Sequence, residues 1–219
     1  MHKKQLPIVE LTLDKIVGGG QTIGTLPDGR KCFVWGGLPG ETVNVQLTKL
    51  KSRLAEGIVC DILTPSDERV TPRDPESYLS TSPWQMMNIA SESHYKAALI
   101  EEAFELHHVV LPDPIEVYTD DRVYEYRNKV EFSWFWDNEK NQLDLAFHRR
   151  GSHGKIPITG TSLARPEINT LACSIRDLLR TKDIEARNLK TLLIRCDQTG
   201  NCVWQLYVKD KLPNIVTAD

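Results

Sequence analysis

Residues 126–136 read YRNKVEFSWFW, and residues 143–150 read LDLAFHRR. In the first stretch the apolar residues Val130, Phe132, Trp134 and Trp136 alternate with other side chains. A period of two indicates a β-strand that turns one face inward and leaves the other partly solvated. The polar run DNEKNQ at 137–142 predicts a turn between the stretches. We therefore expect a β-hairpin with basic residues near its start and its end.

The basic residues of this hairpin form a candidate site for a polyanion. Residues 149–155 read RRGSHGK, and the glycines allow the backbone to approach a ligand closely. Guanidinium groups suit phosphate oxygens because they donate paired hydrogen bonds. The candidate phosphate contacts here are Arg127, Lys129, Arg149, Arg150, His153 and Lys155. The alternative is an ordinary solvated strand end.

The totals are those of an ordinary soluble protein. A chain of 219 residues exceeds the usual size of one domain, so two compact units are expected. Lys plus Arg (27) nearly balances Asp plus Glu (30), so a polyanion site must come from local segregation of charge. The sequence has neither a long apolar run nor a secretion signal, which predicts a cytoplasmic protein without a membrane contact. Five cysteines without a CxxC pair argue against a disulfide framework and a zinc site.

Residues 1–63 predict a small closed barrel. Glycine-rich or proline-rich turn signals recur at 18–20, 27–29 and 36–40, and the intervening stretches alternate or are rich in β-branched residues. The LPGE turn at 38–41 and the basic link that holds Lys49, Lys51 and Arg53 resemble a TRAM domain, an OB-like RNA-binding barrel. The resemblance implies a second set of phosphate contacts at these three residues.

The remainder predicts an α+β domain. Residues 64–77 hold three prolines and no periodicity, which is typical of a linker. Residues 78–219 follow as the second domain, with a helix from about Ser91 to His107, for which Asn88 is an alternative cap. A second helix begins at Pro166, and a last hairpin spans 192–208. The expected fold is therefore a small all-β OB-like barrel followed by an α+β domain with antiparallel hairpins and two helices.

Several short motifs follow one another in an order that resembles a known family. They are PWQM at 83–86, YK at 95–96, YRNK at 126–129, FHRRGSH at 147–153 and LARPEIN at 163–169. Their order and spacing resemble the N-terminal half of the RNA uracil-5-methyltransferases, over nearly the whole chain. The resemblance implies structured RNA, tRNA or rRNA, as the partner and 5-methyluridine as the product of the complete enzyme. It makes the basic residues of the hairpin and of the barrel candidate RNA contacts.

The resemblance also defines two cofactor expectations. Many family members hold an iron–sulfur cluster on four cysteines, but here the matching positions are Leu79, Ser82 and Thr161, so we expect no cluster. In the family S-adenosylmethionine binds a doubly wound C-terminal domain that also supplies the catalytic cysteine and carboxylate. Because this sequence stops at Asp219, we expect no cofactor, no catalytic residue and no methyltransferase activity from this chain alone.

Three functional hypotheses follow. The chain is the RNA-binding portion of a uracil-5-methyltransferase, or a stand-alone RNA-binding or assembly protein that acts with a separate catalytic chain. A third hypothesis is a protein-interaction module whose aromatic strand, Trp134 to Trp136, docks a partner. The glycine trio at 18–20 is a weak nucleotide-binding signal, because a strand rather than a helix follows it.

Overall fold

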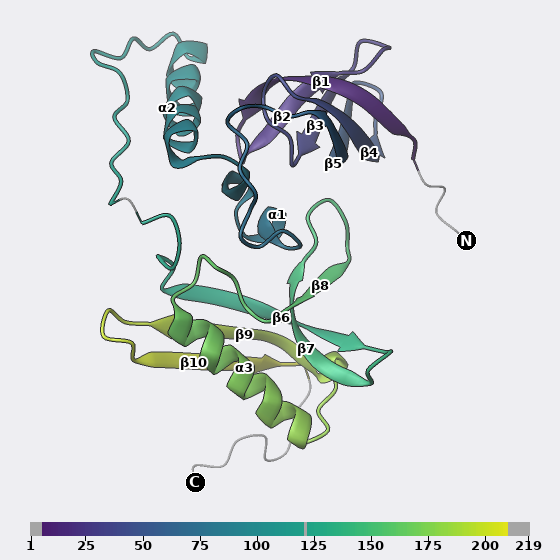
Figure 1. The fold of residues 1–219 in the computed structure, drawn as a ribbon, viewed down its shortest axis with the longest axis vertical. Coiled ribbons are helices and arrows are strands. Elements are labelled where there is room, and N and C mark those ends of the chain that lie inside the picture. Colours follow the sequence, from purple (N-terminus) through teal and green to yellow (C-terminus); the bar gives the residue numbers. More distant parts are fainter. Residues whose placement is uncertain (1–5, 121, 210–219) are drawn as a thin grey trace. The chain divides into compact units, whose positions relative to one another are not determined.

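The computed structural model describes residues 6–120 and 122–209, which form two compact units (Figure 1). The first unit comprises the residues up to Asp120 together with Arg150–Ser152. The second comprises the residues from Arg122 to Arg149 and from His153 onward. The main part of the first unit ends at Asp120, whereas the sequence predicts that the second domain begins at residue 78. A domain spanning 78–219 stays a prediction.

A closed five-stranded barrel forms the N-terminal part of the first unit, as predicted (Figure 1). Its strands are β1 (Ile8–Val17), β2 (Gln21–Thr25), β3 (Lys31–Trp35), β4 (Thr42–Leu50) and β5 (Leu54–Thr64), and they close in the order β1-β2-β3-β5-β4. β3 and β5 pair in parallel, and the other neighbours are antiparallel. Alternate apolar side chains fill the interior, among them Leu13, Val34 and Val45. Gly57 permits this packing, since a Cβ there would lie 2.3 Å from Val45 Cγ1.

The predicted linker is tied to the barrel by a buried ion pair. The Glu41 side chain is fully buried, and its two carboxylate oxygens accept from Arg69 Nε at 2.5 Å and Nη2 at 2.6 Å. The same carboxylate accepts from the backbone N–H groups of Leu38 and Ser66. Arg69 also forms an isolated β-bridge with Met87. Residues 66–69 are therefore fixed to the LPGE turn.

Two short helical turns and one long helix follow the linker in the first unit. They are α1 (Tyr78–Thr81), a 3-10 turn at Pro83–Met86 and α2 (Ile89–Leu106). Asn88 caps α2, because its side chain accepts from the Ser91 N–H at 2.8 Å, so the alternative cap of the sequence is the one used. Tyr95 and Leu99 pack against a small core of Ile16, Leu38, Met86 and Met87. Leu106, at the end of α2, is 71% exposed.

The second unit is a five-stranded antiparallel sheet with one helix packed on it (Figure 1). Its elements are β6 (Lys129–Asp137), β7 (Gln142–His148), β8 (Lys155–Ile158), α3 (Pro166–Thr181), a 3-10 turn at Ala186–Asn188, β9 (Leu189–Cys196) and β10 (Cys202–Val208). The sheet order is β10-β9-β6-β7-β8. Both predicted hairpins are confirmed by the pairings β6–β7 and β9–β10. The sequence analysis missed β8, a four-residue strand interrupted by Pro157.

The aromatic alternation of β6 supplies the core between sheet and helix. Phe132 and Trp134 are buried and pack with Ile168 and Leu192, and Trp136 packs against the same cluster. The hypothesis that Trp134–Trp136 dock a partner is therefore wrong, because Trp134 is 1% exposed. On α3 the buried side chains are Ile168, Ala172, Ile175 and Leu179, whereas Leu178 is 43% exposed.

Loss of the buried ion pair is predicted to destabilise the first unit strongly. Arg69→Ala would leave the Glu41 carboxylate buried without its cation, which typically costs about 3–5 kcal/mol. Urea unfolding followed by tryptophan fluorescence measures the change. The matched control is Lys96→Ala, which removes a surface pair with Glu92 worth less than about 1 kcal/mol. Equal losses for both variants would contradict a structural role for Arg69.

The ion pair also predicts how stability depends on pH. Burial by itself raises the pKa of Glu41, but hydrogen bonds from Arg69, Ser66 and Leu38 outweigh it, so the pKa is lowered from 4.5. A lowered pKa gives stability that is present above the unfolded value and is lost as pH falls through the folded value. The stability difference between the wild type and Glu41→Gln is therefore expected to shrink below about pH 4.5. A difference that stays constant down to acid unfolding would contradict this account.

Candidate nucleic-acid interface

One end of the barrel gathers five basic residues. The β2–β3 turn ends in Arg30 and Lys31, and the β4–β5 connection carries Lys49, Lys51 and Arg53. Parallel pairing places Lys31 beside Leu54, and Arg30 Nη1 donates to the Lys51 carbonyl at 2.8 Å. The two connections therefore lie against each other. Only Lys49, Lys51 and Arg53 were predicted from the sequence. Arg30 and Lys31 join them through the pairing of β3 with β5, which no local sequence pattern indicates.

Some of these basic side chains form ion pairs with acidic neighbours, and others are exposed to solvent without such a pair among the described residues of this unit. Arg30 binds Asp28 through two nitrogens, and this hydrogen bonding lowers the pKa of the Asp28 carboxyl. Lys49 pairs with Glu56 at 2.8 Å. Lys51 and Arg53 are exposed, and neither has an ion pair within residues 6–120. These two side chains are thus the best placed on the barrel to meet phosphates.

The basic loop of the predicted hairpin connects β7 to β8. Arg149 and His153 are exposed, and the loop is closed by the Arg149 N–H, which donates to the Gly154 carbonyl at 2.9 Å. Gly151 has a φ of 70°, a left-handed conformation that favours glycine. The loop therefore presents Arg149 and His153 to solvent at a tight turn.

Arg150, in the same loop, has defined partners within the first unit. Its guanidinium carbon lies 4.6 Å from the centre of the Trp35 ring, and its Nε donates to the Leu79 carbonyl at 3.1 Å. A stacked guanidinium keeps its charge and presents its edge to other acceptors. Arg150 thus combines a packing contact, which no local sequence pattern indicates, with a predicted phosphate contact.

The remaining candidates lie at the start of β6 and on β8. Arg127 is anchored by its backbone, which exchanges hydrogen bonds with Leu163 and Arg165. Lys129 lies directly opposite Arg195 of β9 and pairs with Glu131 at 2.7 Å. Lys155 is half-buried and donates to the Trp134 carbonyl at 2.8 Å, and burial lowers its pKa. Lys155 therefore also contributes to the structure of the hairpin.

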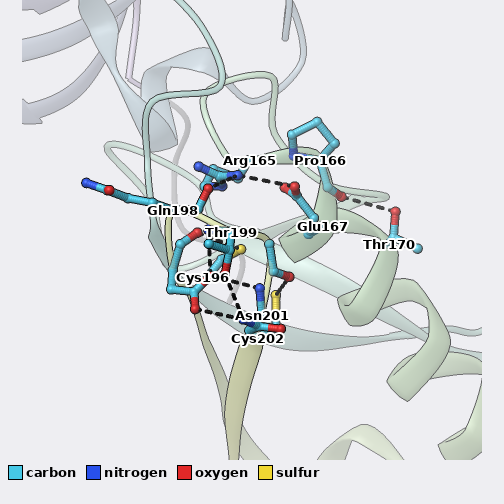
Figure 2. A network of polar contacts seen from close by, with 11 residues as sticks. Arg165, Pro166, Glu167, Thr170, Cys196, Gln198, Thr199, Asn201 and Cys202 are labelled. Carbon is cyan, nitrogen blue, oxygen red and sulfur yellow. Dashed lines mark hydrogen bonds and ion pairs between the residues drawn. The ribbon is translucent and has the colours of Figure 1, made fainter.

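A polar network shapes the turn between β9 and β10 (Figure 2). The Asp197 carboxylate accepts from Thr199 and Asn201, and these bonds lower its pKa to about 2. Arg165 pairs with Glu167 at 3.2 Å, as Figure 2 shows. Beside the turn lies a cavity of about 300 Å³ that Asn128, Arg195 and Val203 help to line. Arg195, which the sequence analysis did not select, is thus a further exposed cation of this unit.

The five cysteines are free thiols that differ in burial. Cys196 and Cys202 face each other across β9 and β10 as free thiols, and burial raises the pKa of Cys202 to about 11. Cys60 is exposed. In the part of the chain that the structure describes, no group of three His, Cys, Asp or Glu side chains converges on a metal-sized site. Leu79, Ser82 and Thr161, where the family has cluster ligands, do not fit an iron–sulfur cluster.

The glycine trio forms a turn and not a phosphate cradle. Gly18–Gly20 connect β1 to β2, and a Cβ at Gly20 would lie 2.8 Å from Pro83 Cγ. Gly20 is therefore packed against Pro83, whereas a Cβ at Gly18 would meet nothing within 4 Å. Within the described ranges, no helix is both long and apolar enough to cross a membrane.

Comparisons with known proteins define the class of this molecule. Residues 8–60 match the TRAM domain family. The 23S rRNA (uracil(1939)-C(5))-methyltransferase of Vibrio cholerae is 31% identical over 171 residues, which is 76% of this chain and 38% of that protein. An uncharacterized RNA methyltransferase of Gloeobacter violaceus is 27% identical over 80% of this chain and 38% of its own length. The chain thus spans about two fifths of the length of these curated relatives.

A solved structure supports the fold. The tRNA (uracil-54, C5)-methyltransferase of Pyrococcus abyssi, in complex with S-adenosyl-L-homocysteine, aligns with 94% of this chain and 48% of its own, with a TM-score of 0.62 and 14% identity. The protein is therefore a TRAM-domain protein of two units. It is a homologue of the RNA uracil-5-methyltransferases.

The barrel end is predicted to supply salt-dependent RNA affinity. Each lost phosphate contact lowers the slope of log K against log salt by about 0.7 to 0.9, so Lys51→Ala with Arg53→Ala should lower it by roughly 1.4 to 1.8. Filter binding with a labelled tRNA transcript measures the slope. The control Lys140→Ala with Lys182→Ala removes the same charge from the far end of the β6–β7 hairpin and from the end of α3. A slope that both pairs lower equally would refute the assignment.

Proposed function

We propose that this chain is the RNA-binding portion of an RNA uracil-5-methyltransferase. The observation that carries the proposal is the five-cation end of a barrel that matches the TRAM domain. Homology to RNA methyltransferases over 76–80% of the chain supports the same function for the second unit. The barrel order β1-β2-β3-β5-β4 is consistent with an OB-like fold, a class that binds nucleic acid on its strand and loop surfaces.

Two sets of basic residues are proposed as RNA contacts. Lys49, Lys51 and Arg53 form the set on the barrel, with Arg30 and Lys31 beside them. The second set comprises Arg127, Lys129, Arg149, Arg150, His153 and Lys155. Arg149 and His153 are the most available of this set, because Arg150 and Lys155 already have protein partners. Both sets bind and orient RNA through its backbone, which fixes position without reading sequence.

The methyl-transfer chemistry is proposed to lie outside these two units. S-adenosylmethionine supplies the methyl group in such enzymes, and addition of a thiolate to the uracil ring activates the accepting carbon. The five cysteines lie in settings that favour packing or solvent exposure over activation, and the glycine trio connects two strands, with Gly20 packed against Pro83. The residues described here therefore hold the RNA while another segment or chain binds the methyl donor.

The RNA is proposed to be structured, either ribosomal or transfer RNA. The Vibrio cholerae relative acts on 23S rRNA and the Pyrococcus abyssi enzyme on tRNA, according to their names. Both are folded RNAs that present a duplex backbone beside accessible loops, the combination that two separate cationic surfaces suit.

Filter binding with the complete 219-residue chain tests the proposal. The probes are a tRNA transcript, a 23S rRNA fragment that contains the region of uridine 1939 and a DNA duplex of equal length. If the four most available basic residues, Lys51, Arg53, Arg149 and His153, each contact a phosphate as cations, RNA affinity should fall about a hundredfold between about 50 and 200 mM salt. The RNA that binds more tightly at the higher salt concentration identifies the substrate class.

Two results would contradict the proposal. If the chain bound RNA and DNA with equal affinity at every salt concentration, it would not recognise RNA specifically. Incorporation of a labelled methyl group from S-adenosylmethionine into the same RNA by this chain alone would place the methyl donor within these residues.

A further inference from the structure

The end of α2 and the segment that follows it expose many large apolar side chains. The exposed fractions are 38% for Phe104, 71% for Leu106, 49% for Val109, 91% for Val110 and 93% for Tyr118. Soluble proteins rarely expose contiguous apolar surface of this kind unless it binds something. These side chains lie outside both sets of proposed RNA contacts.

Part of this surface is a groove with defined walls. A cavity of about 750 Å³ lies between Glu101, Phe104, Glu105 and His108 on one side and residues 109–114 on the other. His108 turns the chain back at a φ of 55°, and the Val109 N–H donates to the Phe104 carbonyl at 3.0 Å. Farther along, the Ile115 N–H donates to Glu101 Oε1 at 2.9 Å. Both hydrogen bonds hold the segment after α2 against that helix, so the groove between them is formed without an occupant.

The charge around the groove is negative. Residues 97–120 contain no Lys or Arg, and their six acidic residues are Glu101, Glu102, Glu105, Asp113, Glu116 and Asp120. Glu102 is paired with Lys15, whereas Glu101, Glu105 and Asp113 line the groove itself. Such a surface repels a phosphate backbone and attracts cations. Its complement is a chain segment with apolar side chains and flanking positive charges.

We propose that this groove binds a basic amphipathic segment of a partner protein. An amphipathic helix suits it, since the apolar face of such a helix enters a groove while its Lys and Arg side chains meet an acidic rim. Phe104, Val109 and Val110 contact the apolar face, and Glu101, Glu105 and Asp113 contact the basic residues. The chain thus carries a protein-docking surface in addition to its RNA contacts.

Fluorescence anisotropy with the complete chain tests the proposal. The probe is a labelled 18-residue amphipathic helical peptide of Leu and Lys. Two control peptides are measured beside it. One is a Leu/Glu peptide of the same pattern, and the other is a Leu/Lys peptide whose scrambled order removes the apolar face. The first peptide is expected to bind, and the other two to bind at least about tenfold more weakly.

Matched variants locate the binding site. Phe104→Ser with Val110→Ser should weaken binding of the Leu/Lys peptide about tenfold or more, whereas Val203→Ser, at an exposed valine of the second unit that does not line the groove, should not. Glu101→Gln with Glu105→Gln and Asp113→Asn should weaken it similarly at low salt. Glu10→Gln with Asp61→Asn and Glu76→Gln removes the same charge from exposed positions elsewhere. Thermal melts confirm that each variant is folded.

Three outcomes would overturn the proposal. Equal weakening by the groove triple and the control triple would mean nonspecific charge attraction. If the scrambled peptide bound as tightly as the amphipathic one, the apolar groove would not contribute to binding. Concentration-dependent sedimentation that Val110→Ser abolishes would instead make the groove an interface between two copies of this chain.

Discussion

Parallel pairing of β3 with β5 is the constraint on which the functional surface depends. It closes the barrel, and it places the β2–β3 turn against the β4–β5 connection, where Arg30 donates to the Lys51 carbonyl. Without this closure the basic residues of the two connections would be separate stretches of a near-neutral chain. Closure also leaves no open edge in the barrel, so its end surface is rigid enough to hold cations in a fixed array.

Local patterns were sufficient to predict the longer elements, but not β8 or α1. The alternation at 130–136, the turn residues at 137–142 and the apolar stripe after Pro166 gave the β6–β7 hairpin and α3, because each signal lies within one stretch of chain. The LPGE turn was recognised, but its Glu41 was not expected to be the buried partner of Arg69. That pair joins residues 28 positions apart, and no periodicity reports such a contact.

The sequence was sufficient to identify many basic residues of the candidate site, but not their arrangement in space or their protein partners. Lys49, Lys51 and Arg53 stand close together in the sequence, so their clustering needed no structure. Arg30 and Lys31 join them only through the nonlocal strand pairing. Arg150 and Lys155 read as free cations in the sequence, yet Trp35, Leu79 and Trp134 engage them. Partners that lie far away in sequence decide how much of a charge remains for a ligand.

The central claim is that the barrel end and the β7–β8 loop hold an RNA backbone. Lysine acetylation of the complete chain, followed by mass spectrometry with and without a bound tRNA transcript, tests it most directly. The account predicts that RNA protects Lys31, Lys49 and Lys51 while Lys140 and Lys182 react as before. Equal protection of all five lysines, or protection confined to the last two, would contradict it.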